Sequence, residues 1–167
     1  PMIIKNKTEL EKMQAAGNLA ASVLEMIEPH VQAGITTEEI DRICCEYVTA
    51  KGGIPAALNY RGFPKGICTS VNHQICHGIP GPKKLKTGDI INLDTAVILD
   101  GYYGDTSKMY AVGKISTLAE RLIRVTQECM YKAIELVKPG VHIGDIGAII
   151  QAHAHANRFS VVREYCG

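Results

Sequence analysis

The sequence lacks any run of apolar residues long enough to cross a membrane, and its first residues, PMIIKNKTELEK, contain no apolar signal-peptide region. It also lacks an excess of either charge, because the formal net charge is +1 and Lys and Arg form no blocks. The composition therefore gives no electrostatic reason to expect a nucleic-acid or membrane partner. From these absences we expect a cytoplasmic protein.

The Cys-x-x-Cys spacing is absent as well, which argues against a zinc ribbon. The cysteines, at positions 44, 45, 68, 76, 129 and 166, are expected to be reduced thiols. What the chain does have is apolar residues, which make up 46% of its 167 positions. This content is enough to bury the core of one ordinary domain.

The segment Gly88 to Val112 has the pattern of a β-hairpin. Ile90 to Leu99 is rich in β-branched and apolar residues, Asp100-Gly101 is a strong signal for a two-residue turn, and Tyr102 to Val112 predicts the returning strand. This hairpin is the stretch of the chain that points most directly to a functional site.

Two carboxylates project from one face of the predicted hairpin. A two-residue loop pairs Ala96 with Asp105 and Asp94 with Ser107, so Asp94 and Asp105 become diagonal neighbours roughly 7–8 Å apart at the backbone. The strands are apolar enough to be buried, where an unpaired charge costs several kcal/mol. A single aspartate would be expected to meet a Lys or Arg or to make a turn contact. Two on one face favour a metal or acid/base site.

The motifs around these carboxylates, DTA and DTS, also resemble the Asp-Thr-Gly signature of aspartic proteases. Those proteases take one such loop from each of two lobes or subunits. Two motifs on one hairpin do not supply that arrangement, so we rank it well below a metal site.

Helical spacing of apolar residues predicts two pairs of helices, one on each side of the hairpin. The expected elements are a helix with a capping box at Thr8 that ends at Pro29, a helix with a capping box at Thr36 that closes at Gly52-Gly53, a strand from Ile67 to Val71, the hairpin, a helix from Thr117 to Lys138, a helix from about Gly144 to Asn157 and a strand from Ser160 to Tyr165. His153 and His155 are expected to be solvent-facing, because residues two apart point in different directions on a helix.

An irregular segment lies between the second helix and the hairpin. Its loop, NYRGFPKG, carries Tyr60 and Phe63, which are candidates for lining a pocket or for plugging the edge of the core. His77, before Gly78, is compatible with a catalytic or metal-binding imidazole and with a hydrogen-bonded structural histidine.

Two segments of the chain match at an offset of 110 residues. The matches are LEMIEPHV, residues 24–31, with IELVKPGV, residues 134–141; Gly34 with Gly144; and Ile40 with Ile150. This similarity indicates a duplication, with a first repeat over about 8–112 and a second over about 117–167. The second repeat is expected to be incomplete, since at this offset it has no counterpart of the hairpin.

Together these segments resemble the type I methionine aminopeptidases, which remove the initiator methionine from nascent proteins. The motifs that carry the resemblance are YRGFPK, CHGIP, GDIINLD, GDTSKM and SVVREYCG, starting at positions 60, 76, 88, 104 and 160. The resemblance covers essentially all 167 residues. It implies an α+β pita-bread fold with pseudo-two-fold symmetry and helices packed on a curved antiparallel sheet. Residues 1–167 would be the N-terminal part of a single catalytic domain.

The resemblance also implies a set of site residues. Asp94 and Asp105 would be ligands of two divalent ions, with Asp105 bridging both, and Co, Mn, Fe or Zn would suit such ligands. His77 would be the catalytic histidine that contacts the substrate. The walls of the methionine pocket would be Tyr60, Phe63 and Cys68. Ala57 departs from members that carry cysteine at that position.

The same resemblance places a histidine ligand directly after the position of Gly167 and two glutamate ligands later, one of them the expected general base. The 167 residues would then supply two of five protein ligands, so we expect weak metal binding and no peptidase activity from them alone. The complete enzyme is expected to act as a monomer on the N-terminal methionine of nascent peptides, with the ribosome as a candidate partner.

Two alternatives remain open. The first is a non-catalytic relative in which the fold serves as a binding scaffold, although the presence of Asp94, Asp105 and His77 argues against it. The second is a prolidase-type dipeptidase, a group that places an extra domain before the first helix.

Overall fold

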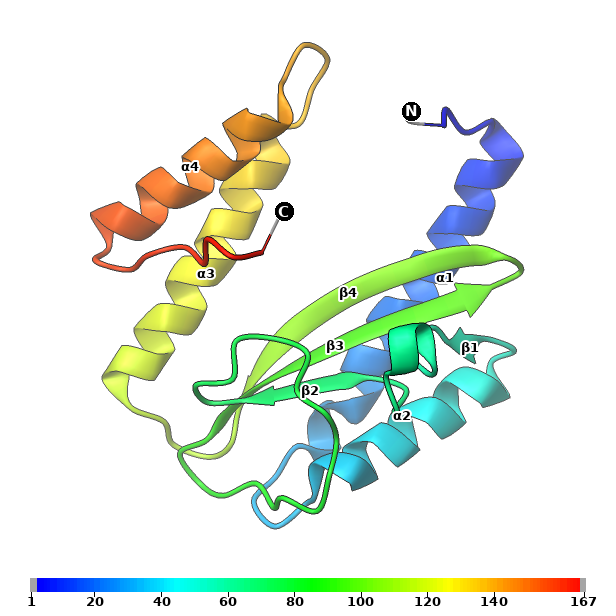
Figure 1. Ribbon diagram of the computed structural model, residues 1–167, viewed down its shortest axis with the longest axis vertical. Helices are drawn as coiled ribbons and strands as arrows, with labels where there is room; N and C mark the ends of the chain where they lie inside the picture. The colour runs from blue at the N-terminus through cyan, green and yellow to red at the C-terminus, as the bar shows by residue number, and fades with distance from the viewer. Residues whose placement is uncertain (1–2, 166–167) are drawn as a thin grey trace. The chain divides into compact units, whose positions relative to one another are not determined.

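A computed structural model describes residues 3–165, which form two compact units that divide between Ile115 and Ser116. The first unit contains two long helices and a four-stranded sheet, and the second contains a helical pair (Figure 1). The elements are α1 Lys7–Ile27, η1 Glu28–His30, α2 Thr37–Ala50, β1 Ile54–Pro55, η2 Tyr60–Gly62, β2 Cys68–Val71, β3 Ile90–Leu99, β4 Tyr102–Ala111, α3 Thr117–Leu136 and α4 Ile143–Ala156.

The predicted hairpin is confirmed as the pair β3 and β4. Its two-residue turn pairs Leu99 with Tyr102, and the register continues so that Asp94 lies opposite Ser107. The other edge of β3 pairs antiparallel with two short strands, β2 over residues 91–94 and β1 at residues 97–98. Strand β3 is therefore the centre of the sheet and fixes the register of every other strand.

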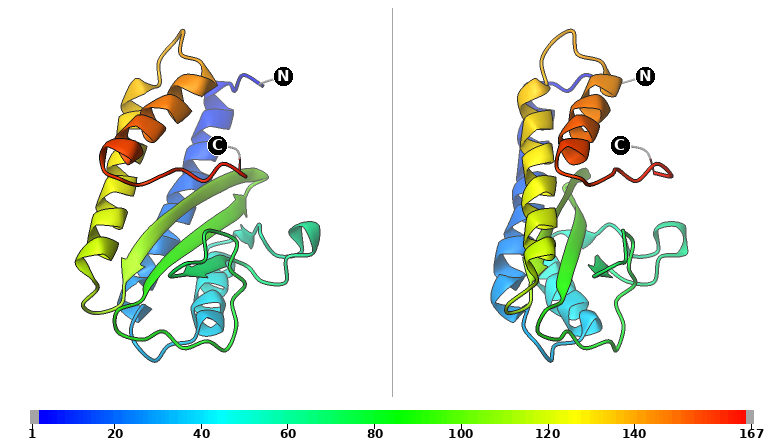
Figure 2. Two further views of the ribbon diagram at one scale, coloured as in Figure 1. Left: turned by 60° about the vertical axis from the view of Figure 1, so that its left-hand side comes forward. Right: turned by 90° about the vertical axis from the view of Figure 1, so that its left-hand side faces the viewer.

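The core of the first unit lies between the sheet and the helices α1 and α2 (Figure 2). Leu93, Val97 and Tyr110 are buried on this face of the hairpin, and the Tyr110 hydroxyl donates a hydrogen bond to the carbonyl of Leu24, at 2.5 Å. Because side chains alternate along a strand, Asp94 lies on the opposite face. The burial of one face thus determines which residues the other face presents.

The helix caps correct two of the predicted starts. The capping box of α1 is formed by Asn6 and Glu9, each side chain accepting the other's backbone N–H, and not by Thr8. Asn6 and Glu9 have the three-residue spacing of a capping box, two positions earlier in the chain than the predicted box at Thr8. Helix α3 is likewise capped by Ser116, one residue before the predicted box. The predicted cap of α2 at Thr36 is confirmed.

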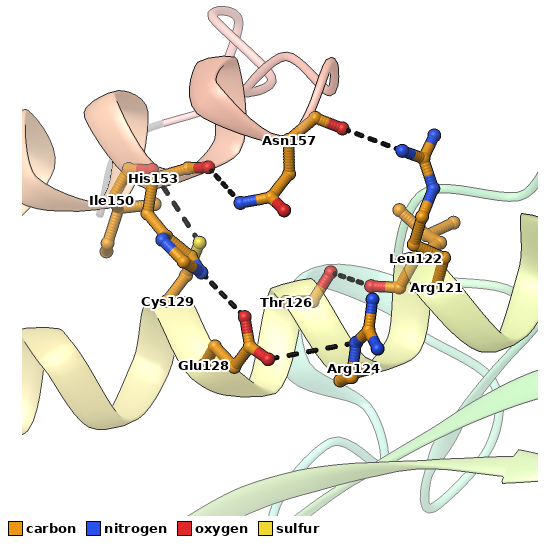
Figure 3. A network of polar contacts seen from close by, with 9 residues as sticks. All are labelled: Arg121, Leu122, Arg124, Thr126, Glu128, Cys129, Ile150, His153 and Asn157. Atoms are coloured by element: carbon orange, nitrogen blue, oxygen red, sulfur yellow. Dashed lines mark hydrogen bonds and ion pairs between the residues drawn. The ribbon is translucent and has the colours of Figure 1, made fainter.

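In the second unit, α3 and α4 pack around a small apolar cluster that includes Val125, Cys129 and Ala154, and polar side chains also join the two helices (Figure 3). His153 Nε2 lies 2.7 Å from Glu128 Oε2, and Arg124 pairs with the same carboxylate at 3.7 Å. The expectation that His153 faces solvent is therefore wrong, because its side chain turns toward α3 and is only 20% exposed. His155 is exposed, as predicted.

The predicted strand from Ser160 to Tyr165 is also wrong, since these residues form no strand in the structure. A strand is stabilised by a neighbour's backbone groups, and no strand in residues 3–165 pairs with this segment. The last two residues of the SVVREYCG motif, Cys166 and Gly167, lie outside the described residues. The other five cysteines are free thiols.

The paired helices have matching lengths, 21 and 20 residues for α1 and α3 and 14 residues each for α2 and α4. The duplication that the sequence suggests stays a prediction. No helix of the part that the structure describes is long and apolar enough to span a bilayer.

Helix α1 lies close against β4, and this contact can be tested. A Cβ at Gly104 would lie 2.1 Å from the carbonyl oxygen of Ala16, so Gly104→Ala is expected to lower the free energy of unfolding by about 1–3 kcal/mol. Gly17→Ala is the matched control, because a Cβ there meets nothing within 4 Å and alanine favours the helix. Urea unfolding should show opposite shifts for the two variants, and equal shifts would contradict the packing.

Candidate active site

The two aspartates of the hairpin lie on the sheet face opposite α1. Asp94 on β3 pairs with Ser107, and Asp105 on β4 pairs with Ala96, which makes the two aspartates diagonal neighbours. Their side chains are within hydrogen-bonding reach of each other. Asp94 is half-buried, whereas Asp105 is exposed, so the expectation that both strands bury their aspartates holds only for β3.

The electrostatics of the pair favour a bound cation. Burial raises the pKa of Asp94 above its usual value, the neighbouring Asp105 carboxylate raises it further, and His77 opposes both effects. A carboxylate with a raised pKa in the folded state lowers stability once it ionises, and that loss is recovered as the pH falls through the raised pKa. Within residues 3–165 neither carboxylate pairs with a Lys or Arg.

The donor set therefore fits a divalent ion, because within residues 3–165 the two adjacent carboxylates form no ion pair with a Lys or Arg. No group of three or more His, Cys, Asp or Glu side chains among those residues could hold a metal. A complete coordination shell would need ligands beyond this pair.

All six residues singled out from the sequence line one cleft of about 750 Å³ in the first unit. They are Tyr60, Phe63, Cys68, His77, Asp94 and Asp105. Sequence reasoning did not assign a further set of lining residues, namely Ala56, Arg61, Gly62, Pro64, Ile79, Ala96 and Tyr103. Ala96 and Tyr103 share the sheet face of the aspartates, so the period of two could have identified them.

One wall of the cleft is a tight loop with unusual backbone angles. Asn59, Arg61 and Gly62 all have positive φ. The Asn59 N–H donates to the Phe63 carbonyl at 2.8 Å and so closes the loop around the 3₁₀ turn η2. The Arg61 guanidinium carbon lies 5.4 Å from the centre of the Tyr60 ring. The Tyr60 side chain is thus held at the rim, where it is 63% exposed.

Cys68, on β2, also lines the cleft, and it lies directly opposite Asp94 in the sheet. Burial, with the Asp94 carboxylate as the next contribution, raises the pKa of the Cys68 thiol to about 11. The thiol therefore keeps its proton at neutral pH and presents a soft, apolar surface to the cleft.

His77 occupies a strained position above β2. Its φ is +55°, in the left-handed region. Both backbone polar groups of the following residue, Gly78, form hydrogen bonds with β2. The Gly78 carbonyl accepts from the Thr69 N–H at 2.8 Å, and the Gly78 N–H donates to Ser70 Oγ at 3.1 Å. These backbone contacts hold the histidine at the cleft.

The sequence profile of metallopeptidase family M24 matches residues 11–167. The chain belongs to metallopeptidase family M24. It is 53% identical to methionine aminopeptidase of Rickettsia prowazekii over 99% of its own length and 65% of the relative. The identity to methionine aminopeptidase of Escherichia coli strain K12 is 54%, over 98% of this chain and 63% of that protein.

Solved structures of methionine aminopeptidases share the fold of this chain. The crystal structure of the Rickettsia prowazekii enzyme matches with a TM-score of 0.97 and 51% identity, over 99% of this M24 chain and 66% of that one, which confirms the expected α+β pita-bread fold. An Xaa-Pro dipeptidase of Bacillus anthracis, at 19% identity and a TM-score of 0.80, covering 92% of this chain and 42% of its own, shares the fold alone. The chain thus spans slightly less than two thirds of the methionine aminopeptidases that it matches.

The acidic pair predicts opposite effects with and without metal. In EDTA, Asp94→Asn should raise the melting temperature by roughly 2–4 °C, the scale of about 1 kcal/mol for a chain of this size, because it removes one of two adjacent like charges. Mn²⁺ should then stabilise the wild type more than the variant. Asp100→Asn, at the exposed turn of the same hairpin, is the control. An Asp94→Asn variant that melts lower in EDTA and gains as much from Mn²⁺ would contradict the site.

The backbone support of His77 gives a second prediction. A Cβ at Gly78 would lie 2.0 Å from the Thr69 carbonyl oxygen, so Gly78→Ala should displace the loop and destabilise the chain by about 1–3 kcal/mol. The nearest atom to a Cβ at Gly81, in the same loop, is 4.0 Å away, so Gly81→Ala should be close to neutral. NMR of the His77 ring should report the displacement, and identical spectra for both variants would refute this account.

Proposed function

We propose that these residues are part of a methionine aminopeptidase, a metal-dependent hydrolase that removes the N-terminal methionine of nascent proteins when the second residue is small. The observation that carries the proposal is the cleft, where the acidic pair Asp94 and Asp105 lies beside an apolar wall. An enzyme that removes one apolar residue by metal-assisted hydrolysis needs both features side by side. The identity to methionine aminopeptidases supports the same assignment.

In this proposal Asp94 and Asp105 would be the residues of this chain that hold two divalent ions. Carboxylate oxygens suit Mn, Fe, Co and Zn alike, so the ligands do not select among these metals. The bound ions would supply a Lewis acid and an activated water. The protein's own contribution is to hold the two carboxylates on adjacent strands, so that the donors are placed before any ion arrives.

The methionine side chain would enter the apolar part of the cleft, against Tyr60, Phe63 and Cys68. A neutral thiol and two aromatic rings suit a polarisable thioether. His77 is proposed as the group that contacts the peptide bond and stabilises the charge that develops there, because it lines the same cleft as the acidic pair. Ala57, which also lines the cleft, leaves more room than a larger residue would.

The family resemblance implies five protein ligands, of which two, Asp94 and Asp105, lie within residues 3–165. We propose that these residues alone bind metal weakly and release no methionine, and that activity requires the remaining ligands. The complete enzyme is proposed to be a cytoplasmic monomer that acts on nascent peptides, with the ribosome as a partner. A prolidase-type activity has the fold likeness alone in its favour, and a purely binding scaffold would leave the adjacent carboxylates without a role.

Release of methionine from a Met-Ala-Ser peptide with Mn²⁺ or Co²⁺ tests the proposal. The chain is compared with a fusion in which it is joined to the segment of the Rickettsia prowazekii enzyme that it does not match. We expect activity from the fusion only, and a loss of at least about a hundredfold on Asp105→Asn in the fusion.

The Asp100→Asn fusion is the control for that loss. Methionine release by the unfused chain would show that the acidic pair suffices. A fusion that folds and binds Mn²⁺ but cleaves a Xaa-Pro dipeptide instead would overturn the substrate assignment.

A further inference from the structure

Asp41 is a buried carboxylate outside the cleft. It lies on α2 and is only 8% exposed. No Lys or Arg in the described part of the chain forms an ion pair with it. Instead, its Oδ1 atom accepts the backbone N–H groups of Gly66 at 2.9 Å and Ile67 at 3.0 Å. A charged acceptor for two buried amides forms stronger hydrogen bonds than a neutral one.

A third donor converges on the same oxygen. The Cys45 thiol, one turn further along α2, donates to Asp41 Oδ1 at 3.7 Å. Burial raises the pKa of this thiol to about 12, and Asp41 adds to the effect, so the donor keeps its proton. The carboxylate is thus stabilised by three hydrogen bonds where an ion pair would otherwise be needed.

The space between Gly66 and α2 is too small for a side chain at this position. A Cβ there would lie 2.1 Å from the Cys45 sulfur and 3.5 Å from Asp41 Oδ1. The absence of a side chain is what lets the two amides reach the carboxylate. Asp41 and Gly66 therefore form one matched contact between α2 and the chain entering β2.

This contact sits at one end of the cleft wall. At the other end, the Ala56 N–H donates to the Ala96 carbonyl of β3 at 2.8 Å. Within the part of the chain that the structure describes, the hydrogen bonds of residues 57–65 stay inside that segment. The loop is consequently tethered to the rest of the unit at Ala56 and at the Asp41 contact.

We propose that Asp41 is a positioning residue for the cleft: it fixes the backbone at Gly66 and Ile67 and so sets the place of the wall formed by Phe63. Phe63 precedes the contact by three residues, whereas Cys68, which follows it directly, is held opposite Asp94 by the sheet. The pair Asp94 and Asp105 lies on β3 and β4, away from the contact. Loss of the Asp41 acceptor should therefore move the apolar wall more than the acidic pair. That the wall receives a methionine side chain rests on the proposed function.

Hydrogen–deuterium exchange of the 167-residue chain tests the positioning directly. Asp41→Ala leaves two buried amides without an acceptor, and exchange over residues 57–68 should accelerate by about tenfold or more. Asp41→Asn keeps an acceptor oxygen and should restore most of the protection. Cys44→Ala is the control, because Cys44 is buried on the same helix but packs in the core. Equal acceleration in Asp41→Ala and Cys44→Ala, or equal acceleration over the whole unit, would overturn the proposal.

Kinetics in the fusion protein give the second readout. Asp41→Ala should raise KM for Met-Ala-Ser by about tenfold and change kcat by less than about threefold, since the wall moves and the acidic pair does not. Asp41→Asn should stay within about threefold of the wild type in both constants. An unchanged KM in Asp41→Ala overturns the link to the pocket. A wild-type fusion that releases no methionine refutes the proposed function, and the exchange measurement then decides the positioning role by itself.

Discussion

The two faces of the β3–β4 hairpin have opposite requirements, and the alternation of side chains along a strand satisfies both. Gly104 lies against α1, whose backbone is too close to admit a side chain. The next residue, Asp105, therefore belongs to the other face, where it is diagonal to Asp94. A slip of one residue would bring a carboxylate against α1 and remove it from the cleft. The register that lets α1 pack against Gly104 is thus the same register that places the acidic pair in the cleft.

The cleft opposes folding in two ways. Without a cation, burial raises the pKa of Asp94, and repulsion from the Asp105 carboxylate raises it further. In addition, Asn59, Arg61 and His77 hold left-handed backbone angles, each of which costs about 1–3 kcal/mol in a residue other than glycine. Such features persist because the core between the sheet and the two helices is stable enough to tolerate them. Like charges and strained backbone that meet at one cleft are typical of a functional site.

The hairpin was predictable because two local signals agree. The strand periodicity and the Asp100-Gly101 turn together determine the register, and the face shared by the two aspartates follows from it. The loop around Tyr60 was not predictable in detail, since its shape depends on positive φ angles and on an acceptor from α2, distant in sequence. His153 was misjudged for a similar reason, because its partner Glu128 lies on another helix. The pattern of side chains within one strand or helix can be predicted from nearby residues. The contact of a side chain with another element can be predicted only when the fold is known.

The contacts that hold the cleft differ in kind from the contacts that line it. The loop ends are held through backbone N–H and carbonyl groups, at Ala56, at Gly66 and at Gly78. The surface that a ligand meets consists of side chains, among them Ala57 and Cys68. Because backbone contacts do not depend on the identity of the lining side chains, substitutions in the lining can alter the size of the pocket while the frame stays in place. Ala57 illustrates the distinction: its side chain lines the cleft, while its backbone carbonyl accepts the N–H of Tyr60 whatever side chain stands there.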